Sequence, residues 1–400
     1  MHEETNFDHS DQNATKLYEL SPYELTIWCI LYTIIALLAI AGNSLVLYVT
    51  LFRLRVRTIT TYFIINLGLA DLLTAIFAIP FKFQAALFQE WFLPNLLCKI
   101  VPYTETVTLS VSVFTLTVSA IHEFRTVFFP KHHQLSANRA RCIVFTIWIF
   151  AVILSLPHGL FHEVIDFEES IDGVMKNISQ CLPTYAEEDW WKFYNVYLTI
   201  MHYFIPMIIL DGAYMMIAIK LCTTTTLKTE GRIEQKNIIS DVSNRKLMKM
   251  LIIVVACFSL CWFPLEIYLL LNELKPEVNK WKYINITFFC AHWLAMSNSC
   301  INVFIYGKFN RKYNYEFRRI FRIIKYRENP EKDDRTSKSI LEESNDRKII
   351  ENSWPTTKSK YRNNENAPFH SETLQAVLFD SQQEEIDHLN QRIVDISNNL

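Results

Sequence analysis

The sequence has no excess of charge of either sign. Its 400 residues include 39 basic and 41 acidic side chains, a formal net charge of −2 at pH 7. This balance excludes a generally basic protein that binds nucleic acid, and it excludes an acidic disordered chain. Charge is also nearly absent from long stretches. With 50% hydrophobic residues and a mean hydropathy of +0.11, this distribution indicates a membrane protein.

Signatures of several other protein classes are also missing. The sequence has no internal repeat of the transporter kind, no Arg-rich voltage-sensor helix and no series of alternating strands that would predict a barrel. Its nine cysteines include no Cys-x-x-Cys pair, and we find no nucleophile–base set or metal-ligand cluster. We therefore expect neither an enzyme nor a cofactor, apart from the sodium ion considered below.

Seven apolar stretches are each about as long as the roughly 20 residues that a membrane-spanning helix needs. A single such stretch could be a core helix of a soluble protein, but seven in series disfavour that interpretation. They are Ile27–Leu51, Tyr62–Phe81, Ile100–Val118, Cys142–Leu160, Phe193–Leu221, Met250–Leu271 and Tyr283–Tyr306. The predicted fold is all-α, a bundle of seven transmembrane helices, numbered here as spans one to seven.

The distribution of basic residues predicts the orientation. Lys and Arg gather in the loops after spans one, three and five and in the segment after span seven, whereas the N-terminal segment and the loop between spans four and five are acidic. Because basic loops stay in the cytoplasm, we expect a multi-pass plasma-membrane protein with its N-terminus outside and its C-terminus inside. Residues 1–24 lack the apolar region of a cleaved signal peptide, so span one is expected to direct insertion.

Three regions follow from this orientation. Residues 1–24 form an extracellular segment, residues 25–325 the membrane domain, and residues 326–400 a mostly disordered, polar cytoplasmic tail. Within the membrane domain, Phe309–Lys325 mixes aromatic and apolar residues with Lys and Arg, which predicts a short amphipathic helix on the inner membrane surface, in contact with lipid. The sequons at Asn13 and Asn177 fall on the outside and predict glycosylation.

Two of the nine cysteines are clearly extracellular. Cys98 lies at the outer entrance of span three and Cys181 in the second outer loop, whereas the other seven fall in or beside spans, where Cys acts as a small apolar residue. Because the extracellular compartment permits disulfides, we predict one bridge between Cys98 and Cys181, which would pin the loop over the bundle.

Ionisable side chains inside a bilayer are costly, so each of them suggests a function. Asp71 in span two has polar company in spans one, three and seven that could converge on it: Asn43, Ser112, Asn298, Ser299 and Asn302. A carboxylate with neutral oxygen-bearing side chains suits a small hard cation such as sodium. The alternative is a hydrogen-bonded packing network.

Two further acids lie nearer the outer ends of their spans. Glu105 in span three and Glu266 in span six could face a water-filled cavity and hold a ligand cation, or each could partner an internal polar group. We assign no role to Asp211, which lies deeper in span five. The expected ligand pocket also includes Trp262, Tyr268 and His292.

Motifs in all the spans form a recognisable set. They are Gly42-Asn43 in span one, Asn66-Leu67-Gly68-Leu69-Ala70-Asp71 in span two, Trp91 before Cys98, Trp148 in span four, Pro206 with Tyr214 in span five, Phe258 and Cys261-Trp262-Phe263-Pro264 in span six, and Asn302 with Tyr306 in span seven. In this combination the chain, over roughly residues 25–325, resembles the rhodopsin-like family of G-protein-coupled receptors.

The resemblance implies the disulfide between Cys98 and Cys181, and heterotrimeric G proteins and arrestin as partners. It implies a sodium site at Asp71, Ser112, Asn298 and Asn302. Within the family, the stretches Ser110–Thr117 and Trp293–Ser299 are most similar to neuropeptide receptors of the neuropeptide Y, RFamide and tachykinin neighbourhood.

Two departures from the family pattern affect its activation motifs. Where the family has Asp-Arg-Tyr or Glu-Arg-Tyr, this chain has His122-Glu123-Phe124, so an acid replaces the arginine that contacts the G protein. In the Asn-Pro-x-x-Tyr motif of span seven, Val303 replaces the helix-kinking proline. We therefore expect ligand binding to be retained and G-protein coupling to be weak or unusual.

The leading interpretation is a cell-surface receptor for a neuropeptide, most simply a basic one because the outer face is acidic. A receptor for a biogenic amine is an alternative, since amine receptors of this family carry Asp where Glu105 stands, although the long acidic second outer loop favours a larger ligand. A second alternative is a decoy or scavenger that binds a peptide without signalling, which the two departures suggest.

Overall fold

The computed structural model describes residues 21–54, 58–129, 135–171, 174–184, 187–229, 238–281 and 283–328. Residues 1–328 belong to one compact unit and residues 329–400 to a second. The sequon at Asn13 and the expected disorder of the cytoplasmic tail lie outside the described residues.

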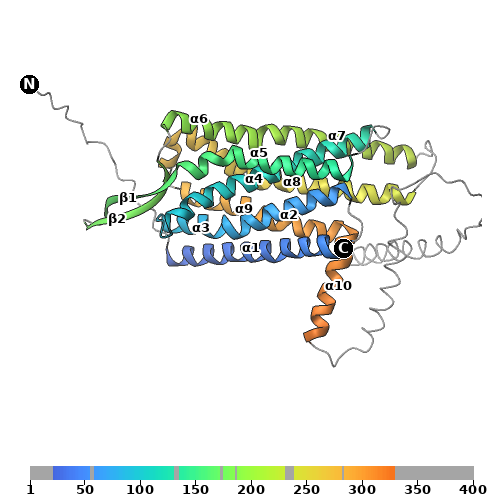
Figure 1. Ribbon diagram of the computed structural model, residues 1–400, viewed down its shortest axis with the longest axis horizontal. Helices are drawn as coiled ribbons and strands as arrows, with labels where there is room; N and C mark the ends of the chain where they lie inside the picture. Colours follow the sequence, from blue (N-terminus) through green and yellow to red (C-terminus); the bar gives the residue numbers. More distant parts are fainter. Residues whose placement is uncertain are drawn as a thin grey trace, which may run out of the picture. The chain divides into compact units, whose positions relative to one another are not determined.

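Seven helical spans run alongside one another, which confirms the predicted bundle (Figure 1). In chain order they are built from α1 (Pro22–Tyr48) with the π-helical turn η1 (Val49–Arg53), α2 (Ile59–Phe77) with α3 (Ile79–Phe88), α4 (Asn95–Phe128), α5 (Ala137–Phe161), α6 (Glu188–Thr199) with the π-helical turn η2 (Ile200–Phe204) and α7 (Ile205–Thr229), α8 (Ile238–Leu274), and α9 (Ile284–Phe309). A 3₁₀ turn, η3 (Pro276–Lys280), joins the last two. Most spans extend beyond the predicted apolar stretches, because polar residues at their ends continue the helix.

The start of α1 shows how a polar sequence sets a helix end. The Ser21 hydroxyl accepts the backbone N–H of Glu24 at 3.3 Å, and the Glu24 carboxylate accepts the backbone N–H of Ser21 at 2.9 Å. This capping box satisfies two donors that would otherwise lack partners, and Pro22 occupies the first helical position, where its missing N–H costs nothing.

The outer surface of the bundle is apolar. Large side chains such as Phe145, Ile208 and Leu260 are 68%, 74% and 72% exposed, which suits contact with lipid tails. Inside the bundle, small residues such as Ala39 and Ala70 are fully buried and allow the helices to approach closely.

The second outer loop folds into a β-hairpin that the sequence analysis did not predict. Strands β1 (His162–Ile171) and β2 (Val174–Pro183) pair antiparallel, with Val164 opposite Cys181. The hairpin is held by tertiary contacts: the Trp91 N–H donates to the Ser179 carbonyl at 2.7 Å, and Ile178 is only 2% exposed. Because its acidic residues do not alternate cleanly with apolar ones, the local pattern resembles a solvated loop.

Helix α10 (Arg311–Glu328) follows α9 and turns away from the bundle at the end opposite the hairpin, which confirms the expected helix after span seven (Figure 1). Its buried Tyr313 bonds to Thr50 at 2.7 Å, and its buried Glu316 pairs with Arg53 at 3.1 Å. The Thr50 hydroxyl donates its only proton to the Val46 carbonyl, so the Tyr313 hydroxyl is the donor in the bond between Tyr313 and Thr50. Burial raises the pKa of Tyr313 to about 12, which keeps this donor protonated.

Candidate functional site

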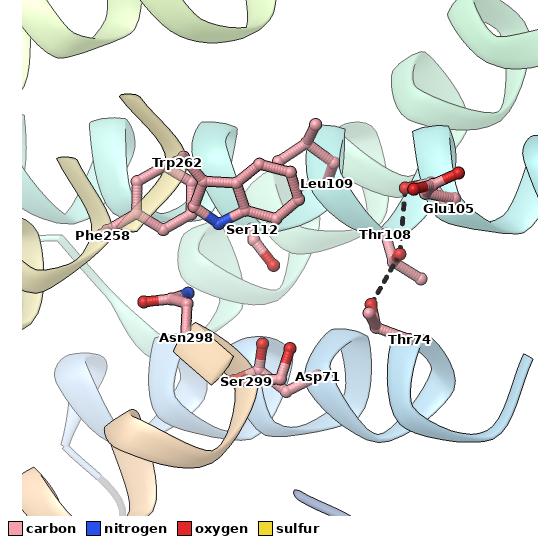
Figure 2. Close-up of a pocket in the computed structure, with 10 residues that line it drawn as sticks. All are labelled: Asp71, Thr74, Glu105, Thr108, Leu109, Ser112, Phe258, Trp262, Asn298 and Ser299. Atoms are coloured by element: carbon pink, nitrogen blue, oxygen red, sulfur yellow. Dashed lines mark hydrogen bonds between the residues drawn. The ribbon is translucent and has the colours of Figure 1, made fainter. Parts of the chain in front are cut away.

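A cavity lies at the centre of the bundle between α2, α4, α8 and α9 (Figure 2). It is lined by Asp71, Thr74, Glu105, Thr108, Leu109, Ser112, Phe258, Trp262, Asn298 and Ser299. A chain of hydroxyl groups lies along one wall: Thr74 Oγ1 donates to Thr108 Oγ1 at 2.8 Å, and Thr108 Oγ1 donates to the Glu105 backbone carbonyl at 3.1 Å. Two of the acids singled out from the sequence, Asp71 and Glu105, therefore border the same cavity.

The inner part of the cavity holds most of the predicted sodium set. Asn302 Nδ2 donates to Asp71 Oδ2 at 3.0 Å, and Ser299 lines the cavity together with Asp71. Ser112 and Asn298 line the same cavity. Among the described residues, the buried amide oxygens of Asn298 and Asn302 accept no hydrogen bond. Unpartnered amide oxygens beside a carboxylate are ligands that a hard cation uses, so these residues fit sodium.

Asn43 lies differently from the other predicted members. Its Nδ2 donates to the backbone carbonyls of Ala39 at 2.9 Å and Ser299 at 2.7 Å, so it ties α1 to α9. It is not among the residues that line the cavity. The expectation that Asn43 converges on Asp71 therefore stays a prediction. The two hydrogen bonds of its Nδ2 show a structural role.

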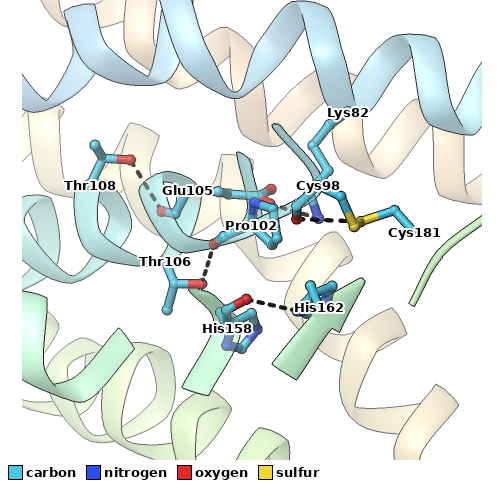
Figure 3. A network of polar contacts seen from close by, with 9 residues as sticks. All are labelled: Lys82, Cys98, Pro102, Glu105, Thr106, Thr108, His158, His162 and Cys181. Carbon is cyan, nitrogen blue, oxygen red and sulfur yellow. Dashed lines mark hydrogen bonds and ion pairs between the residues drawn. A yellow bond between two sulfur atoms is a disulfide. The ribbon is translucent and has the colours of Figure 1, made fainter. Parts of the chain in front are cut away.

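Glu105 has an internal partner that sequence reasoning missed. Lys82, in α3, places its Nζ 2.9 Å from Glu105 Oε2 (Figure 3). The predicted apolar stretch of span two ended at Phe81, one residue short of this lysine, because charge marks the end of a hydropathy segment. Glu105 thus adopts the alternative weighed for it, a partner to an internal polar group.

Glu266, unlike Glu105, has no partner for its carboxylate among the described residues. It is only 4% exposed, and no hydrogen bond or ion pair to its carboxylate occurs within the described part of the chain. Glu105 is close enough to act on it electrostatically. Because leaving a buried carboxylate without a partner costs several kcal/mol, on the order of 2–5, a cationic group would be strongly favoured there.

The three other residues expected in the ligand pocket are spread apart. Trp262 lines the cavity, and its buried Nε1 has no partner among the described residues. His292 is buried behind the cavity, where its Nδ1 bonds to the Tyr32 hydroxyl at 2.8 Å. Tyr268 packs its ring 5.4 Å from Phe288, near η3. Only the first of the three therefore borders the cavity itself.

The predicted disulfide is confirmed. Cys98 at the start of α4 and Cys181 on β2 are bonded, with their Cα atoms 5.6 Å apart (Figure 3). The bond joins the hairpin to α4 beside Lys82 and Glu105. Asn177, on the same strand, is exposed, as a glycosylation acceptor must be, and its modification stays a prediction.

Replacing Cys98 or Cys181 by Ser should lower surface expression and ligand binding together, because the hairpin would lose its covalent tie to α4. Flow cytometry of an epitope-tagged receptor and a binding assay would measure the two effects. Cys29→Ser, at a free and half-buried cysteine, is the control. Wild-type expression and affinity in both Cys98→Ser and Cys181→Ser would contradict the structural role.

At the opposite end of α4, Glu123 turns into the bundle. It is 3% exposed, and the Thr60 hydroxyl donates to its Oε1 at 3.2 Å. No described Lys or Arg side chain pairs with it, Arg125 and Lys249 included. Its neighbours in the motif pack against aromatic rings, His122 on Phe63 and Phe124 on Phe128. Glu123 therefore links α4 to α2 inside the bundle.

Val303 packs where α9 meets α1. A Cβ added to Gly42 would come within 2.9 Å of Val303 Cγ2, so Gly42 is needed for this contact. Helix α9 runs without an internal proline from Ile284 to Phe309. The other activation motifs keep the expected places: Tyr214, Phe258 and Tyr306 are buried, Pro264 lies inside α8, and Pro206 follows the π-helical turn η2.

The family model described as "7 transmembrane receptor (rhodopsin family)" matches residues 42–306. The chain is 27% identical over 303 residues to the Substance-P receptor of Mus musculus, covering 75% of this chain and 72% of that one. It is 29% identical over 316 residues to the Neuromedin-K receptor of Oryctolagus cuniculus, covering 78% and 64%.

Proposed function

The chain belongs to the rhodopsin family of seven-transmembrane receptors, which are not enzymes, and on this basis we propose that it is a cell-surface receptor for a basic neuropeptide. Its similarity to receptors named for substance P and neuromedin K supports a peptide ligand. Membership of the family implies coupling to a heterotrimeric G protein. The termini have the orientation set by the basic loops, with the N-terminus outside the cell.

The buried carboxylate of Glu266 is the observation that supports a cationic ligand. Lys82 neutralises Glu105, whereas no described residue pairs with the buried Glu266. A ligand Arg or Lys would supply the missing partner. The acidic outer face also speeds the encounter with a basic peptide, with an association rate that falls as salt rises.

A binding and signalling screen tests this function. Cells expressing the chain would be exposed to a library of basic, amidated neuropeptides, with binding and nucleotide exchange read separately. Saturable binding of a basic peptide supports the proposal. Binding confined to acidic peptides or to small amines would refute it.

The amine-receptor alternative loses support from the Lys82–Glu105 ion pair, because the carboxylate at the amine position already has a cation. The decoy alternative is favoured by two contacts: Glu123 is bonded to Thr60 inside the bundle, and Val303 packs on Gly42. In that case the peptide binds and nucleotide exchange stays low.

The cytoplasmic partners proposed here are a G protein and arrestin, which would dock at the inner ends of α4, α7 and α8. Helix α10 would lie on the inner membrane surface, since Tyr313 and Phe317 anchor it and its Lys and Arg residues favour anionic lipid.

The residues Asp71, Ser112, Asn298 and Asn302 would hold a sodium ion, which would neutralise the buried carboxylate. We expect NaCl, compared with KCl at equal ionic strength, to raise the melting temperature of the purified receptor. Asp71→Asn should abolish this difference, because it removes the charged ligand. Asp211→Asn, a matched change at an intramembrane acid on the exposed side of α7, should leave the difference intact. An equal sodium effect in Asp71→Asn would exclude this site.

A further inference from the structure

Two histidines lie one helical turn apart where α5 ends and the hairpin begins. His158 is in the last turn of α5, and His162 is the first residue of β1. Their rings are inclined by only 23°, with centroids 5.5 Å apart, and Figure 3 shows the two residues beside each other. Neither residue lines the central cavity.

The hydrogen bond of His162 fixes its tautomer. Its Nδ1 lies 2.8 Å from the backbone carbonyl oxygen of His158. A carbonyl oxygen only accepts, so Nδ1 carries the proton and Nε2 of the neutral ring holds a lone pair.

The same reasoning applies to His158. The Tyr194 hydroxyl has a single proton, which it donates to the Leu154 carbonyl at 2.9 Å. At 3.2 Å from His158 Nδ1 it must therefore accept, so His158 Nδ1 is the donor. In the neutral ring of His158, Nε2 again holds a lone pair.

Both Nε2 atoms thus hold a lone pair that no described residue uses. Within the described part of the chain, neither accepts a hydrogen bond, and both rings are half-buried. Trp191 packs against both rings, with centroid distances of 5.2 Å to His158 and 5.6 Å to His162. Two imidazoles four residues apart, each held through Nδ1 by an oxygen acceptor, match the way that histidines bind zinc.

We propose that His158 and His162 bind a zinc ion through their Nε2 atoms. Water or a group of a bound ligand would complete the shell, because no cluster of three or more His, Cys, Asp or Glu ligands exists among the described residues. The charge of nearby Lys82 opposes a cation at these rings, and its ion pair with Glu105 at 2.9 Å reduces that repulsion without cancelling it. The ion would fasten the end of α5 to the first strand of the hairpin.

The test uses the full-length receptor in lipid nanodiscs with ZnCl₂ as the probe. Free thiols are alkylated first, because Cys142, Cys222 and Cys290 are exposed and bind zinc themselves. Calorimetry and thermal unfolding should both report one saturable site, with a melting temperature that rises with zinc and not with Mg²⁺.

Single substitutions test whether His158 and His162 are the residues that bind zinc. His158→Phe and His162→Phe keep an aromatic ring against Trp191 and should each weaken zinc binding at least tenfold. Tyr194→Phe removes the acceptor that orients His158 and should weaken binding about tenfold, as loss of an outer partner commonly does. His202→Gln changes another buried histidine, which bonds to Ser110, and should leave zinc affinity unchanged.

Two results would overturn the proposal. One is unchanged zinc affinity in the His158→Phe, His162→Phe double variant, and the other is no binding to the unmodified receptor at millimolar zinc. Should the variants fail to fold, Co²⁺ added to the unmodified, alkylated receptor decides: a spectrum of imidazole-bound cobalt supports the site, and the spectrum of cobalt in water refutes it.

Discussion

Replacing Glu266 by Gln should weaken binding of a basic peptide more than tenfold. The change removes the charge of a buried carboxylate that has no partner within the described structure, and with it the expected ion pair to the ligand. Loss of one partner of a desolvated ion pair costs about 2–5 kcal/mol. Glu105→Gln should have a smaller effect, because Lys82 already occupies that carboxylate. Equilibrium binding of a labelled peptide measures both changes.

Glu277→Gln is the matched control. Glu277 lies in η3 at the outer end of the bundle, so the variant makes the same charge change at the surface. It should alter the association rate and its salt dependence more than the dissociation rate. If Glu105→Gln and Glu266→Gln each change affinity less than threefold, below about 1 kcal/mol, neither carboxylate holds the ligand.

The double change Glu123→Arg, Val303→Pro should raise agonist-driven nucleotide exchange about fivefold or more, within the range of coupling energies between sites. An arginine donates several hydrogen bonds and is always charged, so it can reach carbonyl groups of a docking helix, whereas an ionised Glu only accepts. The proline restores a kink in α9 and removes the contact of Val303 with Gly42. Exchange of labelled nucleotide on purified G protein measures the effect.

Controls separate signalling from folding. Agonist affinity and surface expression of the double variant should stay close to those of the unmodified chain. Thr60→Val removes only the hydroxyl that donates to Glu123, and it should not restore exchange, because no donor to the G protein is added. Robust exchange in the unmodified chain, at the level of related receptors, would show that both departures are tolerated and that the decoy alternative is wrong.

Much of the membrane fold could be predicted from the sequence because its causes are local. Hydrophobic length specifies the spans, and the position of Cys98 and Cys181 outside the apolar stretches marks them as the pair that oxidises. Asp71, Ser112, Asn298 and Asn302 could be grouped in advance, since polar groups in a bilayer must find partners inside the bundle. The hydrogen bond from Asn302 to Asp71 agrees with that grouping.

Other features depended on which side chains face one another across the bundle. Lys82 decided which of Glu105 and Glu266 is free to bind a cation, because its Nζ lies 2.9 Å from the Glu105 carboxylate. Hydropathy cannot report that pairing. The hairpin was likewise decided by its contacts with Trp91 and Cys98, which lie far from it in the chain. The sequence by itself thus determined the family, the spans and the Cys98–Cys181 disulfide, because each follows from local composition and motif. Only the tertiary structure decided the partner of each buried charge, because a partner is set by distance in space.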